Sequence, residues 1–451
     1  MEIIENKQIK EKVYLETLEN GMKVIIIPKK YTEKKYIIWG TKFGSIDNHF
    51  IEPTTGKEIQ VPDGVAHYLE HKMFEQENGV DSLYKLMSLG LDANAYTTND
   101  HTAYLFGGTN NFYEGLDELM DYVQHPYFTD ENVEKERGII GQEIGRYNDE
   151  PAWQLYVNMM DCLYTNNPVK LDIAGTVESI SKITKETLFS CYNTFYHPSN
   201  MILCVSGNFE PEQILEEIKK RLLPREKIGE IKRIYPEHEY KINKPFKEQK
   251  MDVNIPLFIT GFRDILEDEN KIMKHIAIEI ILNSLIGKSS KLYQELYNTG
   301  LLLGTLDFDY EFSDEYSHVI ISGQSENPEK VNEKVLEVLT NTTVSKEDFE
   351  RSKKALYGEY LSEYDDVESI GRMFLQDGIK GINSLDYIDV FKTIDLEYVN
   401  KIQKDLFKKE MSALSIVRKW MSKNVDRKTT QIIKTSQNNL DFDVKIWYFY
   451  K

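Results

Sequence analysis

Cysteine is scarce in this sequence, with three residues in a chain of 451: Cys162, Cys191 and Cys204. They are odd in number, lie far apart and include no CxxC pair. A disulfide framework would need paired cysteines, and a thiolate zinc site would need them closely spaced. The sequence therefore indicates a reducing environment and excludes both kinds of cysteine site.

Long apolar runs and basic runs are also missing. No segment approaches the length of about 18 apolar residues that a membrane-spanning helix needs, so we expect no membrane partner. The start, "MEIIENKQIKEKVYLETLENG", is charged and lacks the apolar core of a secretory signal. Lys and Arg number 55 against 74 Asp and Glu, for a net charge of −19, so nucleic acid is not an expected partner. These features together predict a cytoplasmic protein.

The chain is too long for one hydrophobic core, and its elements recur in order. "VYLETLENGMKVIIIPKK" predicts a hairpin around Asn20-Gly21. Further strands, an apolar helix, a strand pair, several helices and a closing strand follow, and a similar order returns later in the chain. We predict an α+β protein with a first domain at 1–223, a linker at 224–245 and a homologous second domain at 246–451.

The chain has only nine histidines, and two of them lie in "GVAHYLEHKMFE". We predict a helix here with Asp63 as its N-cap. Residues four apart share a helix face, so His67 and His71 present both imidazoles to one point, as a zinc site requires. Glu70 lies on that face and is suited to take a proton from a metal-bound water. The order H-x-x-E-H is the inverted zincin arrangement.

A chance pair of histidines on a helix is the alternative reading, and a third ligand would argue against it. Catalytic zinc has three protein ligands and one open position. "VEKERGIIGQEIGRYNDEP" supplies Glu136 and Glu143, which are seven residues apart and therefore on one helix face. Taken alone, two such glutamates would be surface residues.

These motifs, in this order, resemble the pitrilysin/insulinase zinc peptidases, a family that includes the mitochondrial processing peptidase. The resemblance covers essentially the whole chain. It implies two bowl-like halves, each a mostly antiparallel sheet with helices packed on one face. It also implies that Zn²⁺ is bound by His67, His71 and Glu143, that Glu70 is the catalytic base, and that Glu136 supports a ligand.

The third ligand has an alternative. The spacing between His71 and Glu143 is a little short for the family, and Glu150 lies seven residues further along. The pairing of Glu143 with Glu136 and the "ER-x5-E" context favour Glu143.

"NAYTTNDHTAYLF" resembles the edge strand that follows the zinc helix in this family. The resemblance implies that a peptide substrate adds to this edge as a further strand and bonds to the backbone of Asn94, Ala95 and Tyr96. Without the family, the stretch is simply a strand with a polar turn.

One family feature is missing. Single-chain active members carry an arginine and a tyrosine, seven apart, that stabilise the oxyanion. In "GKSSKLYQELYNTGLLLGTLDF" those places are taken by Tyr297 and Gly304. This departure implies a heterodimer with a homologous subunit that carries the pair, a homodimer being the other assembly. The alternative is that Tyr310, Tyr316 or Arg263 replaces the donors within the chain.

The sequence thus predicts a zinc-dependent endopeptidase subunit that cleaves short or unfolded peptides. A non-catalytic scaffold or substrate-presenting subunit is the second hypothesis, although such relatives usually lose the zinc ligands. A dedicated processing peptidase for a leader peptide is the third, and nothing in the residues separates it from general peptide turnover.

Overall fold

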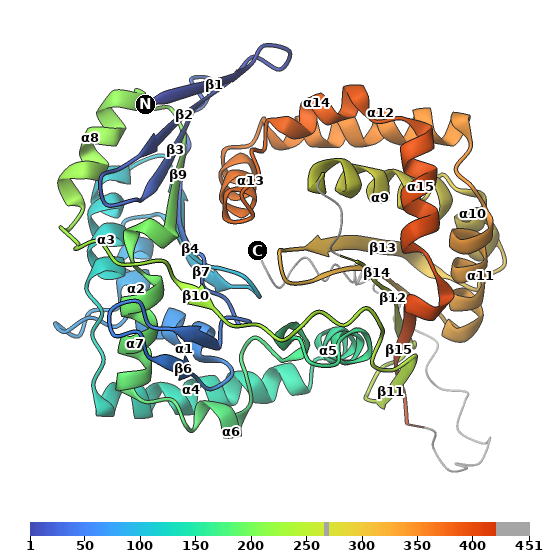
Figure 1. The fold of residues 1–451 in the computed structure, drawn as a ribbon, viewed down its shortest axis with the longest axis horizontal. Coiled ribbons are helices and arrows are strands. Elements are labelled where there is room, and N and C mark those ends of the chain that lie inside the picture. Colours follow the sequence, from blue (N-terminus) through green and yellow to red (C-terminus); the bar gives the residue numbers. More distant parts are fainter. Residues whose placement is uncertain (266–269, 421–451) are drawn as a thin grey trace, which may run out of the picture.

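The computed structural model describes residues 1–265 and 270–420, which form two α+β halves that lie side by side (Figure 1). The strands are β1 (Glu2–Asn6), β2 (Glu11–Thr17), β3 (Lys23–Pro28), β4 (Lys35–Thr41), β5 (His49–Ile51), β6 (Glu58–Gln60), β7 (Asp92–Thr97), β8 (Thr102–Gly108), β9 (Met201–Gly207), β10 (Lys232–Arg233), β11 (Phe246–Lys250), β12 (Leu257–Arg263), β13 (Leu303–Phe312), β14 (Ser317–Gln324) and β15 (Ser412–Arg418).

The helices are α1 (Val65–Lys72), α2 (Ser82–Ser88), α3 (Phe112–Gln124), α4 (Asp130–Asn148), α5 (Pro151–Leu163), α6 (Val177–Ile180), α7 (Lys185–Phe195), α8 (Pro211–Arg221), α9 (Lys271–Leu285), α10 (Lys291–Asn298), α11 (Pro328–Asn341), α12 (Lys346–Glu363), α13 (Val367–Ile379), α14 (Asp386–Thr393) and α15 (Leu396–Leu406), with short 3₁₀ turns η1 (Pro168–Lys170), η2 (Pro198–Asn200) and η3 (Lys409–Met411).

The two main sheets share one strand plan. The first half has a seven-stranded sheet in the order β1-β2-β3-β9-β4-β8-β7, and the second has a five-stranded sheet in the order β11-β15-β12-β14-β13. The last five strands of the first sheet correspond, strand by strand, to the five strands of the second sheet. Each set has one parallel pair, β3 with β9 and β11 with β15, and all its other pairs are antiparallel. The predicted α+β fold of two homologous halves is confirmed.

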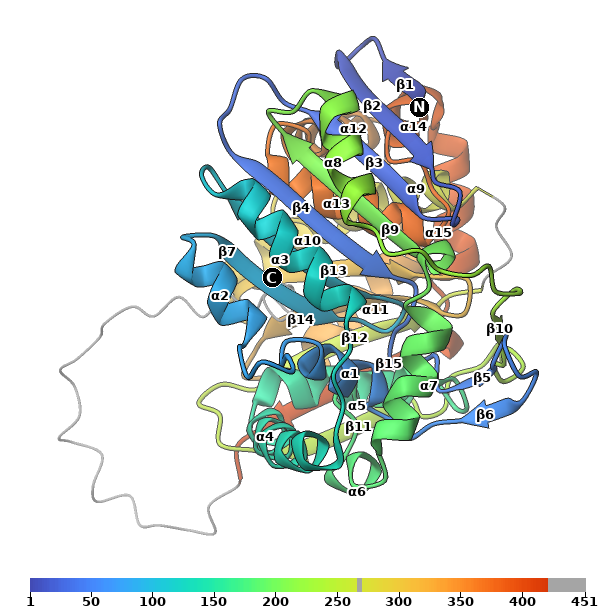
Figure 2. The same ribbon diagram turned by 90° about the vertical axis from the view of Figure 1, so that its left-hand side faces the viewer.

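The central strands β3, β4 and β9 of the first sheet are buried on both faces, which explains their continuous hydrophobic runs. In β4, Ile37 and Trp39 pack with the helices of the same half, whereas Tyr36 and Ile38 belong to a separate core on the opposite face. Successive side chains of a strand point to opposite faces, so a strand covered on both sides needs no polar alternation. Figure 2 shows this sheet with α3 and α8 in front of it.

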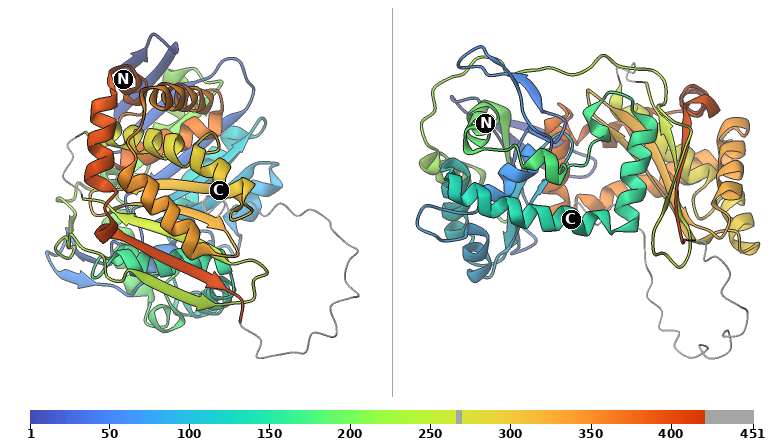
Figure 3. Two further views of the ribbon diagram at one scale, coloured as in Figure 1. Left: turned by 90° about the vertical axis from the view of Figure 1, so that its right-hand side faces the viewer. Right: turned by 90° about the horizontal axis from the view of Figure 1, so that it is seen from below.

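Each half contributes one helix to the sheet of the other half. Ile370, Phe374 and Leu375 of α13 pack on the face of the first sheet that is turned toward the second half. In the reverse direction, Met159 and Leu163 of α5 enter a core with strands of the second sheet. Figures 1 and 3 show α13 beside β4 and β9, and α5 reaching from the first half to β15. The sequence predicts helices on only one face of each sheet. The other face is covered by the helix from the opposite half, α13 on the first sheet and α5 on the second.

The contact of α13 with the first sheet depends on a glycine. A Cβ at Gly371 would lie 2.7 Å from Cδ1 of Tyr36 and 3.1 Å from Oγ of Ser206. We therefore expect Gly371→Ala to lower the free energy of unfolding by about 1–3 kcal/mol, because the methyl group overpacks this interface. Thermal unfolding measures the effect.

Gly358 provides the matched control, since it lies inside α12 and a Cβ there would meet nothing within 4 Å. Gly358→Ala should raise the stability by up to about 1 kcal/mol through helix propensity alone. If Gly371→Ala raised the melting temperature as much as Gly358→Ala, the close packing of α13 would be contradicted.

Two further sequence predictions have an outcome here. The hairpin around Asn20-Gly21 is confirmed, because β2 and β3 pair antiparallel on either side of it. The prediction of Asp63 as the N-cap is wrong: Gly64 caps α1 with a left-handed φ of 88°, and Asp63 instead accepts a hydrogen bond from Asn48 at 2.9 Å. No helix in the part of the chain that the structure describes is long and apolar enough to cross a membrane.

The predicted linker lies between α8 and β11. Within 224–245 the structure assigns only the two-residue strand β10, which pairs with β5 in a small three-stranded sheet. The domain division at 1–223 and 246–451 stays a prediction.

Candidate metal centre

Helix α1 turns one face to the core and the other to a cavity of about 550 Å³. Tyr68 and Leu69 are fully buried in the core of the first half, whereas His67, Glu70 and His71 line the cavity. Gly64 makes this placement of α1 feasible, because a Cβ there would lie 2.5 Å from the carbonyl oxygen of Ala174. The start of the helix is therefore held tightly against a neighbouring loop.

Helix α4 supplies the opposite wall. It begins at a capping box, in which Thr129 accepts a hydrogen bond from the backbone of Asn132 and the Asn132 side chain accepts one from Thr129. The hydroxyl of Tyr68 donates to the carbonyl oxygen of Val133, which ties α1 to α4. Glu136 and Glu143, two turns apart on α4, both line the cavity.

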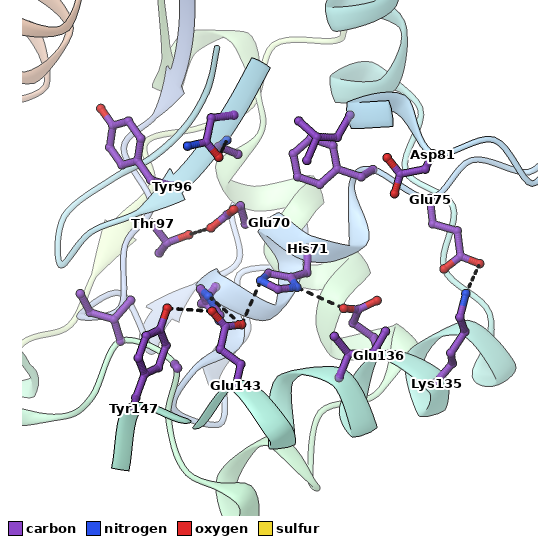
Figure 4. A pocket seen from close by; sticks show the side chains of 18 of the residues that line it. Glu70, His71, Glu75, Asp81, Tyr96, Thr97, Lys135, Glu136, Glu143 and Tyr147 are labelled. Atoms are coloured by element: carbon purple, nitrogen blue, oxygen red, sulfur yellow. Dashed lines mark hydrogen bonds and ion pairs between the residues drawn. The ribbon is translucent and has the colours of Figure 1, made fainter. Parts of the chain in front are cut away.

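The structure brings His67, His71 and Glu143 together. Oε2 of Glu143 lies 3.4 Å from Nε2 of His71 and 3.9 Å from Nε2 of His67. One potential ligand atom from each residue lies within 4.8 Å of the others, and among the described residues this is the one set of three or more such groups that could hold a metal ion. Figure 4 shows the carboxylate of Glu143 directed at His71.

The neighbours of the two histidines prepare them to act as ligands. Nδ1 of His71 lies 3.1 Å from Oε1 of Glu136, which leaves Nε2 directed at Glu143. Burial opposes protonation of His71, but the hydrogen bond to Glu136 and the surrounding carboxylates raise its pKa above the usual value. Burial, with a contribution from His71, lowers the pKa of His67 to about 3, so this imidazole is neutral at neutral pH.

Glu136 itself is held as an anion. Burial alone would raise its pKa, but the hydrogen bond and charge of His71, with the charge of Lys72, lower it. Nζ of Lys72 lies 3.9 Å from Oε2 of Glu136 and 2.6 Å from Oε2 of Glu75. The fully buried Lys72 thus places a positive charge next to the Glu136 carboxylate that contacts His71.

Glu70 is close to the two histidines but does not join their contacts with Glu143. Its Oε2 accepts a hydrogen bond from Oγ1 of Thr97 at 2.7 Å, which orients the carboxylate (Figure 4). Burial raises the pKa of Glu70, although the charge of His71 and the Thr97 hydroxyl act in the opposite direction. A carboxylate with a raised pKa is suited to accept and return a proton.

The strand β7 is one of the two edge strands of the seven-stranded sheet, as the resemblance implies, and it runs beside the cavity. Asn94, Ala95 and Tyr96 all contribute to the cavity wall. The Tyr96 ring, however, lies in the core on the α13 side of the sheet. The part of Tyr96 that remains for a ligand at the sheet edge is therefore its backbone.

The structure also shows where the alternative third ligand and the two positions of the missing donor pair lie. Glu150 is the residue before α5 and does not line the cavity. Neither do Tyr297, which is exposed on α10, nor Gly304, at the start of β13. The positions that correspond to the missing donors therefore lie away from the candidate metal centre of this chain.

The three proposed replacement donors are engaged elsewhere. The hydroxyl of Tyr310 donates to Asp264 at 2.7 Å, and the guanidinium of Arg263 donates to the carbonyl oxygen of Ser317 at 3.0 Å. Tyr316 is buried, and none of the three residues lines the cavity. The arrangement does not favour replacement of the pair by these three residues.

Sequence reasoning missed two hydroxyl groups. Thr97 holds Glu70, and the hydroxyl of Tyr147 donates to Oε1 of Glu143 at 2.7 Å. Tyr147 could have been found, because it lies one helical turn after Glu143 on the same face. Thr97 could not, since its contact with Glu70 joins a strand to a helix.

The donor set fits a zinc ion. Two imidazole nitrogens and one carboxylate oxygen converge, and this combination of two histidines and a glutamate is a known set of catalytic zinc ligands. The side of the set that faces the cavity leaves room for a fourth ligand. His67 is neutral at neutral pH, as metal binding requires, whereas the raised pKa of His71 means that a metal ion binding there must displace a proton more often.

Comparison with known proteins shows which proteins this chain is similar to. The family model described as "Insulinase (Peptidase family M16)" matches residues 57–177, and "Peptidase M16 inactive domain" matches residues 182–356. A Bacillus subtilis protein named "Uncharacterized zinc protease YmfH" is 37% identical over 92% of this chain and 99% of its own length. The mitochondrial-processing peptidase subunit beta of Dictyostelium discoideum is 22% identical, over 82% of this chain and 81% of its own.

A solved structure is similar over the same extent. The putative M16-like peptidase from Alicyclobacillus acidocaldarius superposes with a TM-score of 0.86 at 32% identity, covering 92% of this chain and 99% of the other. The sequence identity, the shared two-half fold and the family matches lead to one conclusion: this chain belongs to the insulinase (M16) family of peptidases.

Proposed function

We propose that this chain is a zinc-dependent endopeptidase subunit that cleaves short or unfolded peptides. One observation carries the proposal: Nε2 of His67, Nε2 of His71 and Oε2 of Glu143 converge in a cavity that also contains the buried carboxylate of Glu70. The names of the relatives, several of which are called zinc proteases, point in the same direction.

In this proposal His67, His71 and Glu143 hold Zn²⁺, which would supply a bound water of pKa near 7 and polarise the substrate carbonyl. Glu70 accepts the proton of the attacking water and passes it to the leaving amine. Thr97 holds one oxygen of Glu70 through its hydroxyl, so the other oxygen is free for this transfer. Glu136 keeps His71 in the orientation that directs Nε2 at Glu143.

The substrate is an extended peptide that adds to β7. An outermost strand has backbone groups on one side that a further strand can pair with, so a peptide bound there is read mainly through its main chain. Asn94, Ala95 and Tyr96 are the proposed partners. We therefore expect loose sequence selectivity and exclusion of stably folded proteins.

A homologous subunit would complete this site. The arginine and tyrosine that the family places in its C-terminal half are replaced here by Tyr297 and Gly304, which lie away from the cavity. We propose that a homologous chain supplies both donors in a heterodimer, with a homodimer as the alternative assembly. The cytoplasmic location stays a prediction.

The second candidate, a non-catalytic scaffold or substrate-presenting subunit, has some support from the family model named "Peptidase M16 inactive domain" over residues 182–356. The model matched over residues 57–177, which contain the candidate ligands, carries no such name. Processing of one leader peptide and general peptide turnover would use the same residues.

Metal analysis tests the ligand set. We expect one zinc per chain after purification without chelator, and a large loss in His71→Ala and Glu143→Gln, because each removes one of three ligands. Glu150→Gln is the matched control and should keep the wild-type zinc content. Equal zinc in wild type and His71→Ala would refute the assignment, and loss in Glu150→Gln but not Glu143→Gln would transfer the third ligand to Glu150.

A further inference from the structure

The two oxygens of Glu143 have different surroundings. Oε2 is the atom that faces the Nε2 atoms of His67 and His71. Oε1 accepts a hydrogen bond from the hydroxyl of Tyr147 at 2.7 Å, and Nη2 of Arg146 approaches it at 3.5 Å. The carboxylate therefore has one oxygen held by its own helix and one oxygen presented to the histidines.

The Tyr147 side chain is held in place from several directions. Its ring packs against the indole of Trp153, with centroids 5.2 Å apart and ring planes inclined by 30°. Trp153 is in turn fixed by donation from Nε1 to Oδ2 of Asp172 at 2.6 Å. The guanidinium of Arg146 lies 5.2 Å from the centroid of the Tyr147 ring. A tyrosine has few rotatable bonds, so these contacts leave its hydroxyl little freedom.

Arg146 and Tyr147 are unequal partners for Oε1. The Arg146 side chain is 72% exposed and its contact is long, so solvent and salt weaken it. The Tyr147 hydroxyl makes a short bond from the wall of the cavity and lies beside a carboxylate whose side chain is mostly buried. The tyrosine is the group able to determine the orientation of Glu143.

We propose that Tyr147 is a positioning residue that keeps Glu143 as a ligand through the single oxygen Oε2. This inference rests on the proposed function, since it assumes that Glu143 binds the metal. Ordering a free carboxylate opposes metal binding, and a hydroxyl that orders it beforehand removes that opposition. Ligation through one oxygen also keeps the fourth position of a catalytic zinc site open for water.

The test compares Tyr147→Phe with Arg146→Gln, which removes the other contact to the same oxygen. Tyr147→Phe should weaken zinc affinity about 10–100-fold, as removal of a hydrogen bond to a ligand typically does. It should also alter the visible absorption of the Co²⁺-substituted protein, which reports the ligand geometry directly. Arg146→Gln should leave both readouts close to wild type. Affinity is measured by competition with a chromophoric chelator.

A purely structural role is separated by thermal unfolding of the metal-free proteins. We expect similar melting temperatures for wild type, Tyr147→Phe and Arg146→Gln without metal, and a lower one for Tyr147→Phe only when zinc is added at limiting concentration. Wild-type affinity together with a wild-type Co²⁺ spectrum in Tyr147→Phe would overturn the proposal, as would equal effects of the two variants.

Glu143→Gln distinguishes failure of this inference from failure of the proposed function. If Glu143→Gln loses zinc and Tyr147→Phe does not, the ligand assignment stands and the role of Tyr147 is refuted. If neither variant changes zinc affinity, the ligand assignment fails and the role of Tyr147 fails with it.

Discussion

Replacing Glu70 with glutamine should abolish most peptide cleavage while leaving zinc bound. A carboxamide has nearly the same shape and can still accept the hydrogen bond from Thr97, but it cannot take a proton from water. Loss of a general base costs about 10²–10⁴-fold in rate. Because Glu70 is not among the three converging ligand groups, the metal content should remain at one zinc per chain.

The assay follows cleavage of an unstructured, fluorescence-quenched peptide by zinc-loaded protein together with the partner subunit. Glu77→Gln is the control, because Glu77 is exposed in the loop that follows α1 and does not line the cavity. Turnover by Glu70→Gln close to that of Glu77→Gln, at equal zinc content, would remove Glu70 from the role of base.

The isolated chain should bind zinc but cleave peptides slowly, and a homologous subunit with the arginine–tyrosine pair should restore turnover. Loss of one oxyanion donor costs about 10²–10³-fold in kcat, so the mixture should exceed the isolated chain by at least this factor. The structure supports the expectation, because Tyr297 and Gly304 lie away from the cavity and Tyr310 and Arg263 have other partners.

Turnover of one peptide is compared for this chain alone, for a homologous subunit that lacks H-x-x-E-H but carries the pair, and for their mixture. A mixture that contains the Glu70→Gln variant of this chain should stay inactive, which would assign the chemistry to this chain. Rapid cleavage by the isolated zinc-loaded chain, unchanged by the partner, would contradict the shared site.

Much of the fold follows from local sequence patterns. The hairpin at Asn20-Gly21 and the helix α1 that carries His67 and His71 have strong local signals and form as expected. Helix α13, "VESIGRMFLQDGI", carries a mixed local signal, because its buried residues recur at helical spacing but two glycines lower its helix propensity. Its apolar face packs on the sheet of the opposite half, and no local pattern shows that this distant segment is its partner.

In the candidate site too, some features follow from local sequence and others depend on contacts between distant segments. The shared face of His67, Glu70 and His71 follows from helical spacing, and the structure brings Glu143 to them. Asp63 was wrongly expected to cap α1, because the helix start is determined by the close approach of Gly64 to Ala174. The same limit applies to Thr97, whose role depends on where β7 ends relative to α1.

Anomalous scattering at the zinc absorption edge tests the central claim most directly. Crystals of the protein grown with one equivalent of zinc should give one strong peak between Nε2 of His67, Nε2 of His71 and Oε2 of Glu143, with each ligand atom about 2.0–2.2 Å from the metal. Glu70 should approach the fourth position without binding the ion. The absence of a peak at these three residues, or a peak held by Glu150 instead, would contradict the account.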